Sequence, residues 1–357
     1  MPSIEATVRR LTTLAAVCAT LVSSIPAAAA TGDLCLRGVN LSGAEYGDVD
    51  GKEGFNFTYP SQTTQSYFAD KGFDTVRLPI KWERLQPRMG QALEPVELAR
   101  LKTSVASLQQ HGYAVILDPH SFGYYYSYKI GSAEMPPRQF ADFWMRLALE
   151  FANQDGVIFG LMNEPHDILP RDWLVSANAA IAGIRAVKAR NLILVPGTYW
   201  SGASSWENDF GDGANADVML GVRDSVDNYA FEVHQYMDQD FSGTHEQCVN
   251  AVGAANALAG FSAWMRAHGK KGFLGEFGGS SEPACLDGLK GMVELIGKDS
   301  DVWLGWTYWA AGDWWSADEG NNIQPTKDGD RAQLASLLPS LSPSAQKPAA
   351  CAIIPKN

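Results

Sequence analysis

The stretch VIFGLMNEPHD, Val157–Asp167, is the point from which the fold of this chain can be worked out. It begins with an apolar run typical of a buried parallel strand, which we expect to span Val157–Asn163. Pro165 cannot continue a sheet, and it biases the residue before it towards an extended conformation. We therefore expect Glu164 to follow the strand directly and to project beyond the sheet. In parallel α/β folds, this end of a strand is where catalytic groups lie.

Seven further strand-like runs occur along the chain, separated mostly by helical patterns. The expected strands are Leu36–Leu41, Asp74–Pro79, Tyr113–Asp118, Leu192–Val195, Tyr229–His234, Gly272–Glu276 and Val302–Tyr308. The expected helices are Gln62–Lys71, Pro95–Gln110, Arg138–Ala152, Trp173–Lys188, Val249–Ala267, Leu286–Ile296 and Asp330–Leu338. Ser201–Asp227 is long and loop-like, so the pattern defines no regular helix between the fifth and sixth strands. Eight alternating units predict a parallel sheet of the α/β class, closed into a single (β/α)8 TIM barrel.

The two ends of the chain depart from this alternation. Arg9-Arg10 precedes the apolar run Leu11–Ile25 and four alanines, an order typical of a secretory signal peptide. The run is too short and too rich in alanine for a good membrane span. We expect residues 1–30 to be removed on export, residues 31–338 to form the barrel, and residues 339–357 to form a short Pro-, Ser- and Ala-rich tail.

Four cysteines remain outside the signal segment: Cys35, Cys248, Cys285 and Cys351. An even number in an oxidising compartment indicates two disulfides, for which three pairings are possible. In a barrel, Cys35 and Cys351 would lie at the bottom, whereas Cys248 and Cys285 follow the sixth and seventh strands at the top. We therefore predict Cys35–Cys351, which would tie down the tail, and Cys248–Cys285. The alternative, a zinc site, is disfavoured because the spacings are long and no CxxC occurs.

Composition and motif content limit the classes of partner and cofactor that we expect for the protein. The 357 residues carry a formal net charge of −12, and Lys and Arg form no basic run, which argues against nucleic acid and anionic membranes. The chain is rich in aromatic residues, many of them in Gly- and Asp-rich loop stretches. No metal-ligand spacing or Gly-rich phosphate loop occurs, so we predict no metal or organic cofactor. We expect the protein to act as a secreted monomer.

Polar and aromatic residues stand at or near the ends of several expected strands. They are Arg77, His120, Asn163, Glu164, His234, Tyr236, Glu276 and Trp309. The carboxyl ends of barrel strands share one mouth, so these side chains should meet there. Two carboxylates, an arginine, two imidazoles and an aromatic platform are the groups needed to break the acetal bond between two sugars.

The motifs around these residues resemble glycoside hydrolase family 5 of clan A, and within it the cellulase-type enzymes. The matching stretches are GVNLSGAEYG from Gly38, VRLPI from Val76, NEP from Asn163, HQY from His234, GEFGG from Gly275 and YWAAG from Tyr308. They occur in the family's order between about Leu36 and Leu338, each at an expected strand end. The resemblance implies a retaining endo-β-1,4-glucanase.

The resemblance also implies a role for each residue. Glu164 would be the general acid/base and Glu276 the nucleophile, with Arg77 and Tyr236 hydrogen-bonded to Glu276. The residues expected at the sugar are Asn163 at its 2-hydroxyl, His120 and His234 orienting the sugar and the acid/base, and Trp309 as the floor under the ring.

Physical chemistry favours the same division of labour between the two carboxyl groups. Cleavage with retention needs them about 5–5.5 Å apart, one protonated and one ionised. Like charges at that distance push the two pKa values apart. A guanidinium and a phenol beside Glu276 would keep it ionised. We expect Glu164 to lack such a partner and to hold its proton to higher pH.

Aromatic residues in the loops are predicted to line an open cleft, because the apolar face of a β-linked glucose stacks on such rings. The candidates are Tyr46, Tyr124, Tyr125, Tyr126, Tyr128, Trp200, Trp206, Trp314 and Trp315. The alternative for each is that it only braces a loop. Four histidines outside the motifs are predicted to be structural or solvated: His111, His166, His245 and His268.

The favoured interpretation is therefore an enzyme that cuts a cellulose-like β-1,4-glucan internally by double displacement. One alternative is the same chemistry on β-mannan or mixed-linkage glucan. Another is a carbohydrate-binding barrel that has lost catalysis, against which the intact pair of Glu164 and Glu276 argues. A secreted esterase or lipase is disfavoured because no G-x-S-x-G motif is present.

Overall fold

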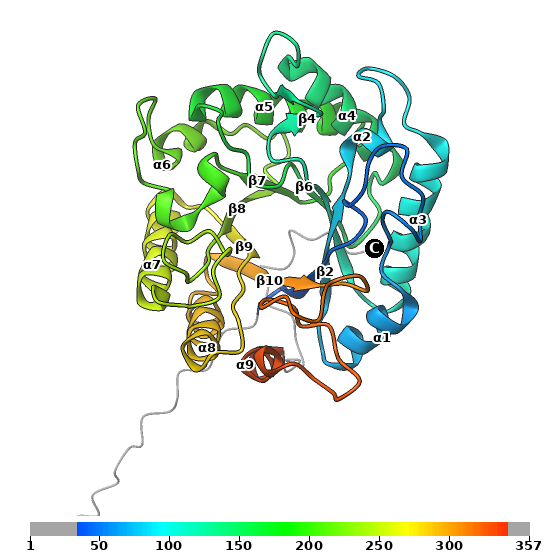
Figure 1. The fold of residues 1–357 in the computed structure, drawn as a ribbon. Coiled ribbons are helices and arrows are strands. Elements are labelled where there is room, and N and C mark those ends of the chain that lie inside the picture. The colour runs from blue at the N-terminus through cyan, green and yellow to red at the C-terminus, as the bar shows by residue number, and fades with distance from the viewer. Residues whose placement is uncertain (1–33, 342–357) are drawn as a thin grey trace, which may run out of the picture. The chain divides into compact units, whose positions relative to one another are not determined.

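The protein folds as a closed barrel of eight parallel strands, as seen in a computed structural model that describes residues 34–341 (Figure 1). The ring order is β1, β2, β3, β6, β7, β8, β9 and β10, and β10 pairs with β1 to close it. These strands span Leu36–Leu41, Thr75–Ile80, Ala114–Pro119, Val157–Gly160, Ile193–Pro196, Tyr229–His234, Gly272–Glu276 and Trp303–Ala311. The predicted (β/α)8 TIM barrel is confirmed.

Helices run between successive strands and surround the barrel (Figure 1). They are α1 (Gln62–Asp70), α2 (Trp82–Leu85), α3 (Pro95–Gln110), α4 (Pro137–Glu150), α5 (Pro170–Ala186), α6 (Asn215–Val218), α7 (Ala251–His268), α8 (Pro283–Lys298) and α9 (Ala332–Leu341). Between β7 and β8 lie only α6 and the 3-10 turns Tyr199–Ser201, Ala203–Ser205 and Met219–Gly221, as the loop-like sequence there predicts.

Alternation along the strands divides the apolar residues into two layers. In β3, Ile116 faces the barrel interior, whereas Val115 and Leu117 pack in the larger core under the helices. The interior cluster consists of Cys35, Leu36, Ile116, Ile158, Leu192, Leu194, Ala230, Phe273 and Leu304. Most of these residues belong to the amino-terminal halves of their strands, so the lower barrel is filled with apolar side chains.

Above this apolar filling, the same inward-facing positions are polar. Asp118 comes two residues after Ile116 on β3, and Glu232 comes two residues after Ala230 on β8, so each continues the inner face of its strand. Both are buried, as is Arg77 on β2. The barrel therefore carries a layer of buried charges directly under its mouth.

Several predicted boundaries are wrong by a few residues. Helices α4, α5 and α8 begin at Pro137, Pro170 and Pro283, earlier than predicted, because proline suits the first turn of a helix. Strand β10 continues past Tyr308 through a cis peptide between Trp309 and Ala310, and α9 extends to Leu341. The loop after β3 holds an unpredicted hairpin of β4 (Tyr124–Tyr125) and β5 (Tyr128–Lys129).

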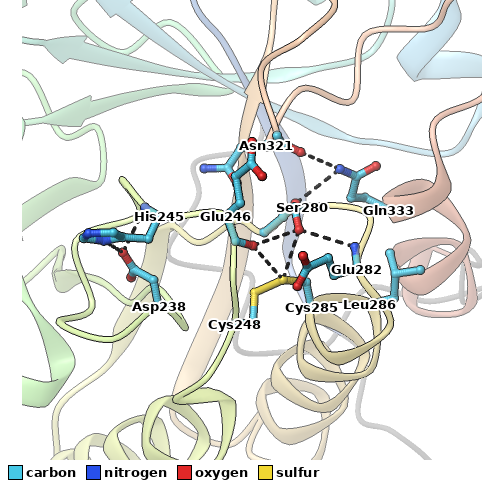
Figure 2. The surroundings of a disulfide bond; sticks show 12 residues. Asp238, His245, Glu246, Cys248, Ser280, Glu282, Cys285, Leu286, Asn321 and Gln333 are labelled. Atoms are coloured by element: carbon cyan, nitrogen blue, oxygen red, sulfur yellow. Dashed lines mark hydrogen bonds and ion pairs between the residues drawn. A yellow bond between two sulfur atoms is a disulfide. The ribbon is translucent and has the colours of Figure 1, made fainter.

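One predicted disulfide is confirmed. Cys248, in the loop after β8, is bonded to Cys285 in α8, with 5.1 Å between the Cα atoms (Figure 2). Beside it, the Ser280 hydroxyl donates to the Glu246 carbonyl over 2.8 Å. Cys351, the predicted partner of Cys35, lies outside the described residues, as do the signal peptide and the tail beyond Leu341. Within residues 34–341, no helix is both long and apolar enough to cross a membrane.

Candidate active site

Glu164 and Glu276 face each other at the mouth of the barrel. One carboxylate oxygen of each, together with a ring nitrogen of His234, lie within 4.8 Å of one another. Glu276 is the last residue of β9 and is buried, whereas the Glu164 side chain is 15% exposed. The two predicted catalytic carboxylates are therefore brought together, with the more accessible one at the opening.

The backbone at Glu164 differs from the prediction. Strand β6 ends at Gly160 rather than Asn163, and Glu164 has φ 41°, in the left-handed region instead of the extended one. Tertiary hydrogen bonds override the local preference: Asn163 N–H donates to the Pro119 carbonyl over 3.0 Å, and Leu161 N–H donates to the Leu194 carbonyl over 3.0 Å. A non-glycine residue in this region is strained and persists only where its surroundings hold it.

Arg77 lies at the centre of the buried charged residues and contacts several of them. It is the third residue of β2, not the last as predicted, and its long side chain reaches up to the mouth. Nη1 donates to Glu276 Oε1 over 2.8 Å and to Asn40 Oδ1 over 2.9 Å, and it lies 3.0 Å from Asp118 Oδ2. Its remaining nitrogens donate to Asn163 Oδ1 over 2.8 Å and to Glu232 Oε1 over 2.9 Å.

Tyr236 and His234 contact Glu164 and Glu276 from β8 and the loop after it. The Tyr236 hydroxyl donates to Glu276 Oε2 over 2.8 Å, so Glu276 has the two predicted partners, Arg77 and Tyr236. His234 Nδ1 lies 2.7 Å from Glu164 Oε1 and 3.6 Å from Glu276 Oε2. Strand β8 thus places against Glu164 the imidazole that was expected to orient the acid/base.

His120 connects Trp309 with the charged residues around Arg77. Its Nδ1 lies 2.7 Å from Asp118 Oδ2, and its Nε2 lies 3.1 Å from the side-chain nitrogen of Asn163. Its ring stacks on Trp309 at 5.2 Å between centroids. Burial raises the pKa of Asp118, but the charges of Arg77 and His120 outweigh this effect, so the pKa is lowered overall. A carboxylate that stays ionised here holds the imidazole of His120 in one orientation.

Burial and neighbouring charges shift the pKa values of Glu276 and His234 in the site. Burial raises the pKa of Glu276 above its usual value of 4.5, while the charges of His234 and Arg77 oppose this rise. Burial lowers the pKa of His234, but the charge of Glu276 and contacts with Glu164 and Glu232 outweigh it and raise this pKa to about 10. His234 is therefore charged at neutral pH, and the neighbouring charge of Glu276 contributes most to this rise.

The aromatic candidates divide into exposed and buried rings. Trp200 and Trp314 are 51% and 40% exposed, Tyr126 and Tyr128 are also exposed, and Tyr46, Tyr124 and Trp315 are partly buried. Tyr125 is buried, and Trp206 is 1% exposed, packed against Phe231, Phe261 and Trp264. Trp206 is therefore a core residue, and its prediction as a cleft residue is wrong.

Four contributors to the site were not predicted from the sequence. Asn40, Asp118 and Glu232 all contact Arg77, and Glu45 accepts from the backbone N–H of Gly43 beside Tyr46. The signal for Asp118 and Glu232 is a carboxylate inside an otherwise apolar strand, which must have a buried cationic partner. His166, predicted to be structural or solvated, stacks on Trp200 at 4.9 Å and so belongs to the rim.

Two groups among the described residues bring three ligand atoms close enough to hold a metal ion. One is Glu164, His234 and Glu276, and the other is Asp238, Asp240 and His245 in the loop after β8. Figure 2 labels Asp238 and His245 of the second group. In the second group, Asp238 already accepts from Ser242 and from the Gly243 backbone. Its oxygens are thus engaged in shaping the loop.

Known proteins resemble the chain over most of its length. A family model described as cellulase, glycosyl hydrolase family 5, matches residues 36–312. The endo-β-1,4-glucanase B of Emericella nidulans is 34% identical over 318 residues, 88% of this chain and 94% of that protein. The structure of the Xanthomonas axonopodis pv. citri endo-β-1,4-glucanase Xac0029 is 45% identical, with a TM-score of 0.84 over 86% of this chain and 98% of that one.

A further solved structure, XacCel5A in complex with cellopentaose, is 44% identical and has a TM-score of 0.84 over 86% of this chain and 99% of that one. These matches agree with the motifs around the two facing glutamates, and they confirm the resemblance seen in the sequence. The chain belongs to the cellulase family, glycosyl hydrolase family 5.

Proposed function

We propose that the protein is a secreted, retaining endo-β-1,4-glucanase that cleaves internal bonds of cellulose-like glucans by double displacement. The observation that carries the proposal is the approach of Glu164 and Glu276, whose nearest carboxylate oxygens lie within 4.8 Å. Retaining glycosidases hold their carboxyl groups about 5–5.5 Å apart, whereas inverting enzymes need room for a water between them. The names of the relatives support a β-1,4-glucan as the substrate.

In the first step, a carboxylate oxygen of Glu276 attacks the anomeric carbon as the glycosidic bond breaks, and Glu164 gives its proton to the departing oxygen. Arg77 and Tyr236 hold the attacking carboxylate in place through both of its oxygens. In the second step, Glu164 takes a proton from water, which attacks the same carbon and releases Glu276.

His234 holds Glu164, the proposed acid/base, in place during both steps. Its Nδ1 lies 2.7 Å from Glu164 and 3.6 Å from Glu276, so it interacts electrostatically with both carboxyl groups. After the first step Glu276 is an uncharged ester and Glu164 is a carboxylate, which is the basic form that the second step requires.

The platform for the sugar is supported by the stacking of Trp309 on His120 and by the exposed rings of Trp200 and Trp314. Rings along an open rim suit a polymer that is gripped in mid-chain. Export is supported by the N-terminal sequence pattern of residues 1–30.

The decisive experiment is a product time course on defined cello-oligosaccharides, with NMR detection of the anomer first released. We expect β-anomers from internal cleavage. The release of α-anomers would refute retention. Reducing ends released from carboxymethylcellulose, lichenan and mannan should be highest for carboxymethylcellulose, and a preference for mannan would refute the substrate assignment.

A further inference from the structure

Glu232 is a buried carboxylate at the centre of the site that the proposed mechanism leaves without a role. It lies on β8, two residues before His234, so both side chains point into the barrel. It is 1% exposed, and its Oε1 faces two cations, Arg77 Nε at 2.9 Å and His234 Nε2 at 3.5 Å. Among the described residues, nothing hydrogen-bonds to its Oε2.

The contact with Arg77 determines how that guanidinium is turned. Nε carries a single hydrogen in the guanidinium plane, so an acceptor at Nε fixes the plane and the direction of both terminal nitrogens. Those nitrogens donate to Glu276 Oε1 and Asn163 Oδ1, each over 2.8 Å. Glu232 thus sets the orientation of Arg77, and Arg77 in turn holds Glu276, the proposed nucleophile.

The contact with His234 works in the same way on the other carboxylate. The two ring nitrogens of His234 lie on opposite sides of the imidazole: Nδ1 is 2.7 Å from Glu164 and Nε2 is 3.5 Å from Glu232. A carboxylate at Nε2 favours a proton on that nitrogen and the charged form of the ring. The charged ring then donates from Nδ1 to Glu164.

Two glycines on other strands leave space for this carboxylate. A Cβ at Gly275, on β9, would lie 2.1 Å from Glu232 Oε1, which is far inside contact distance. A Cβ at Gly160, at the end of β6, would lie 3.6 Å from Oε2. Glycine at position 275, directly before the nucleophile, is therefore a condition for Glu232 to reach both cations.

We propose that Glu232 is a positioning residue that turns Arg77 and His234 towards Glu276 and Glu164, and that it never touches the sugar. The proposal rests on the proposed function of those two glutamates. It predicts a defect in turnover rather than in binding, because the sugar contacts lie above Glu232 at the mouth.

The test compares the variant Glu232→Gln, which keeps the shape of the side chain and removes its charge, with Asp224→Asn. The control removes a charge from a carboxylate whose side chain is fully buried against Arg185 at 2.7 Å, near the other end of β8. For Glu232→Gln we expect kcat on cellopentaose to fall about 100-fold, the scale expected when catalytic groups are misplaced, with little change in KM. Asp224→Asn should keep the wild-type kcat.

A second readout follows the His234 ring directly. In 15N-histidine NMR spectra, assigned with the variant His234→Asn, both ring nitrogens should carry protons at neutral pH in the wild type. In Glu232→Gln, the ring should lose a proton at lower pH than in the wild type, because the carboxylate at Nε2 that favours its charged form is gone. A structural role for Glu232 would not change this titration.

Wild-type kcat together with an unchanged His234 titration in Glu232→Gln would overturn the proposal. If that variant does not fold, Glu232→Asp decides, since it keeps the charge but withdraws the carboxylate by one methylene. A lowered kcat at unchanged KM supports the proposal, and a wild-type kcat overturns it. A wild-type protein without glucanase activity would instead refute the proposed function.

Discussion

The hydrogen bond from Tyr236 to Glu276 allows a quantitative prediction. The variant Tyr236→Phe removes one hydroxyl that donates over 2.8 Å to Oε2 of a buried carboxylate. A hydrogen bond to a charged group contributes about 1.5–3 kcal/mol, and one pKa unit corresponds to about 1.4 kcal/mol. Because the hydroxyl stabilises the ionised form, its loss should raise the pKa of Glu276 by about 1 to 2 units.

In the proposed mechanism turnover requires ionised Glu276, so activity should be lost as the pH falls through its pKa. The acidic limb of the profile of kcat/KM against pH should therefore move to higher pH by about 1 to 2 units in Tyr236→Phe. The profile is measured on cellotetraose. The matched control is Tyr113→Phe, which removes an equally buried hydroxyl that donates to the Gln65 carbonyl over 2.6 Å, away from both glutamates. An acidic limb that overlays the wild type in Tyr236→Phe would refute the assignment of Glu276 as the nucleophile.

Three further predictions test other parts of the molecule. Glu164→Gln should lower turnover of unactivated glucan about 100- to 10,000-fold while calorimetry shows retained binding of cellopentaose, and near-normal turnover would contradict its role as acid/base. Trp200→Ala should weaken oligosaccharide binding about 2- to 10-fold with unchanged stability, whereas Trp206→Ala should cost about 3–5 kcal/mol in urea unfolding; the reverse pattern would contradict the exposed and buried assignments. Replacing Cys248 and Cys285 by serine should lower the free energy of unfolding by about 4 kcal/mol, as expected for their separation of 37 residues, and an unchanged midpoint in urea would argue against a structural role for the bond.

The sequence pattern predicted the barrel well because its signal is repeated. The bounds of strands such as Leu36–Leu41 and Tyr229–His234 are predicted to the residue, since both faces of a parallel strand are buried. The glutamates at 164 and 276 were placed at one mouth because strand direction alone decides that.

Long-range contacts explain what the pattern missed. The left-handed backbone of Glu164 is held by hydrogen bonds from neighbouring residues to other strands, which no local preference encodes. Trp206 looks like a cleft residue by its place in a loop, but the loop folds back and inserts the ring between β8 and α7.

The contacts of Arg77 have a consequence for how this scaffold can change. Arg77 on β2 contacts side chains from β1, β3, the segment after β6, β8 and β9. The same side chain therefore links several barrel strands to one another and holds the groups of the proposed reaction. The loops that carry Trp200 and Trp314 contribute none of the described hydrogen bonds or ion pairs of Arg77. New polysaccharide preferences can therefore arise by loop exchange, while the bond-breaking chemistry is inherited with the barrel itself.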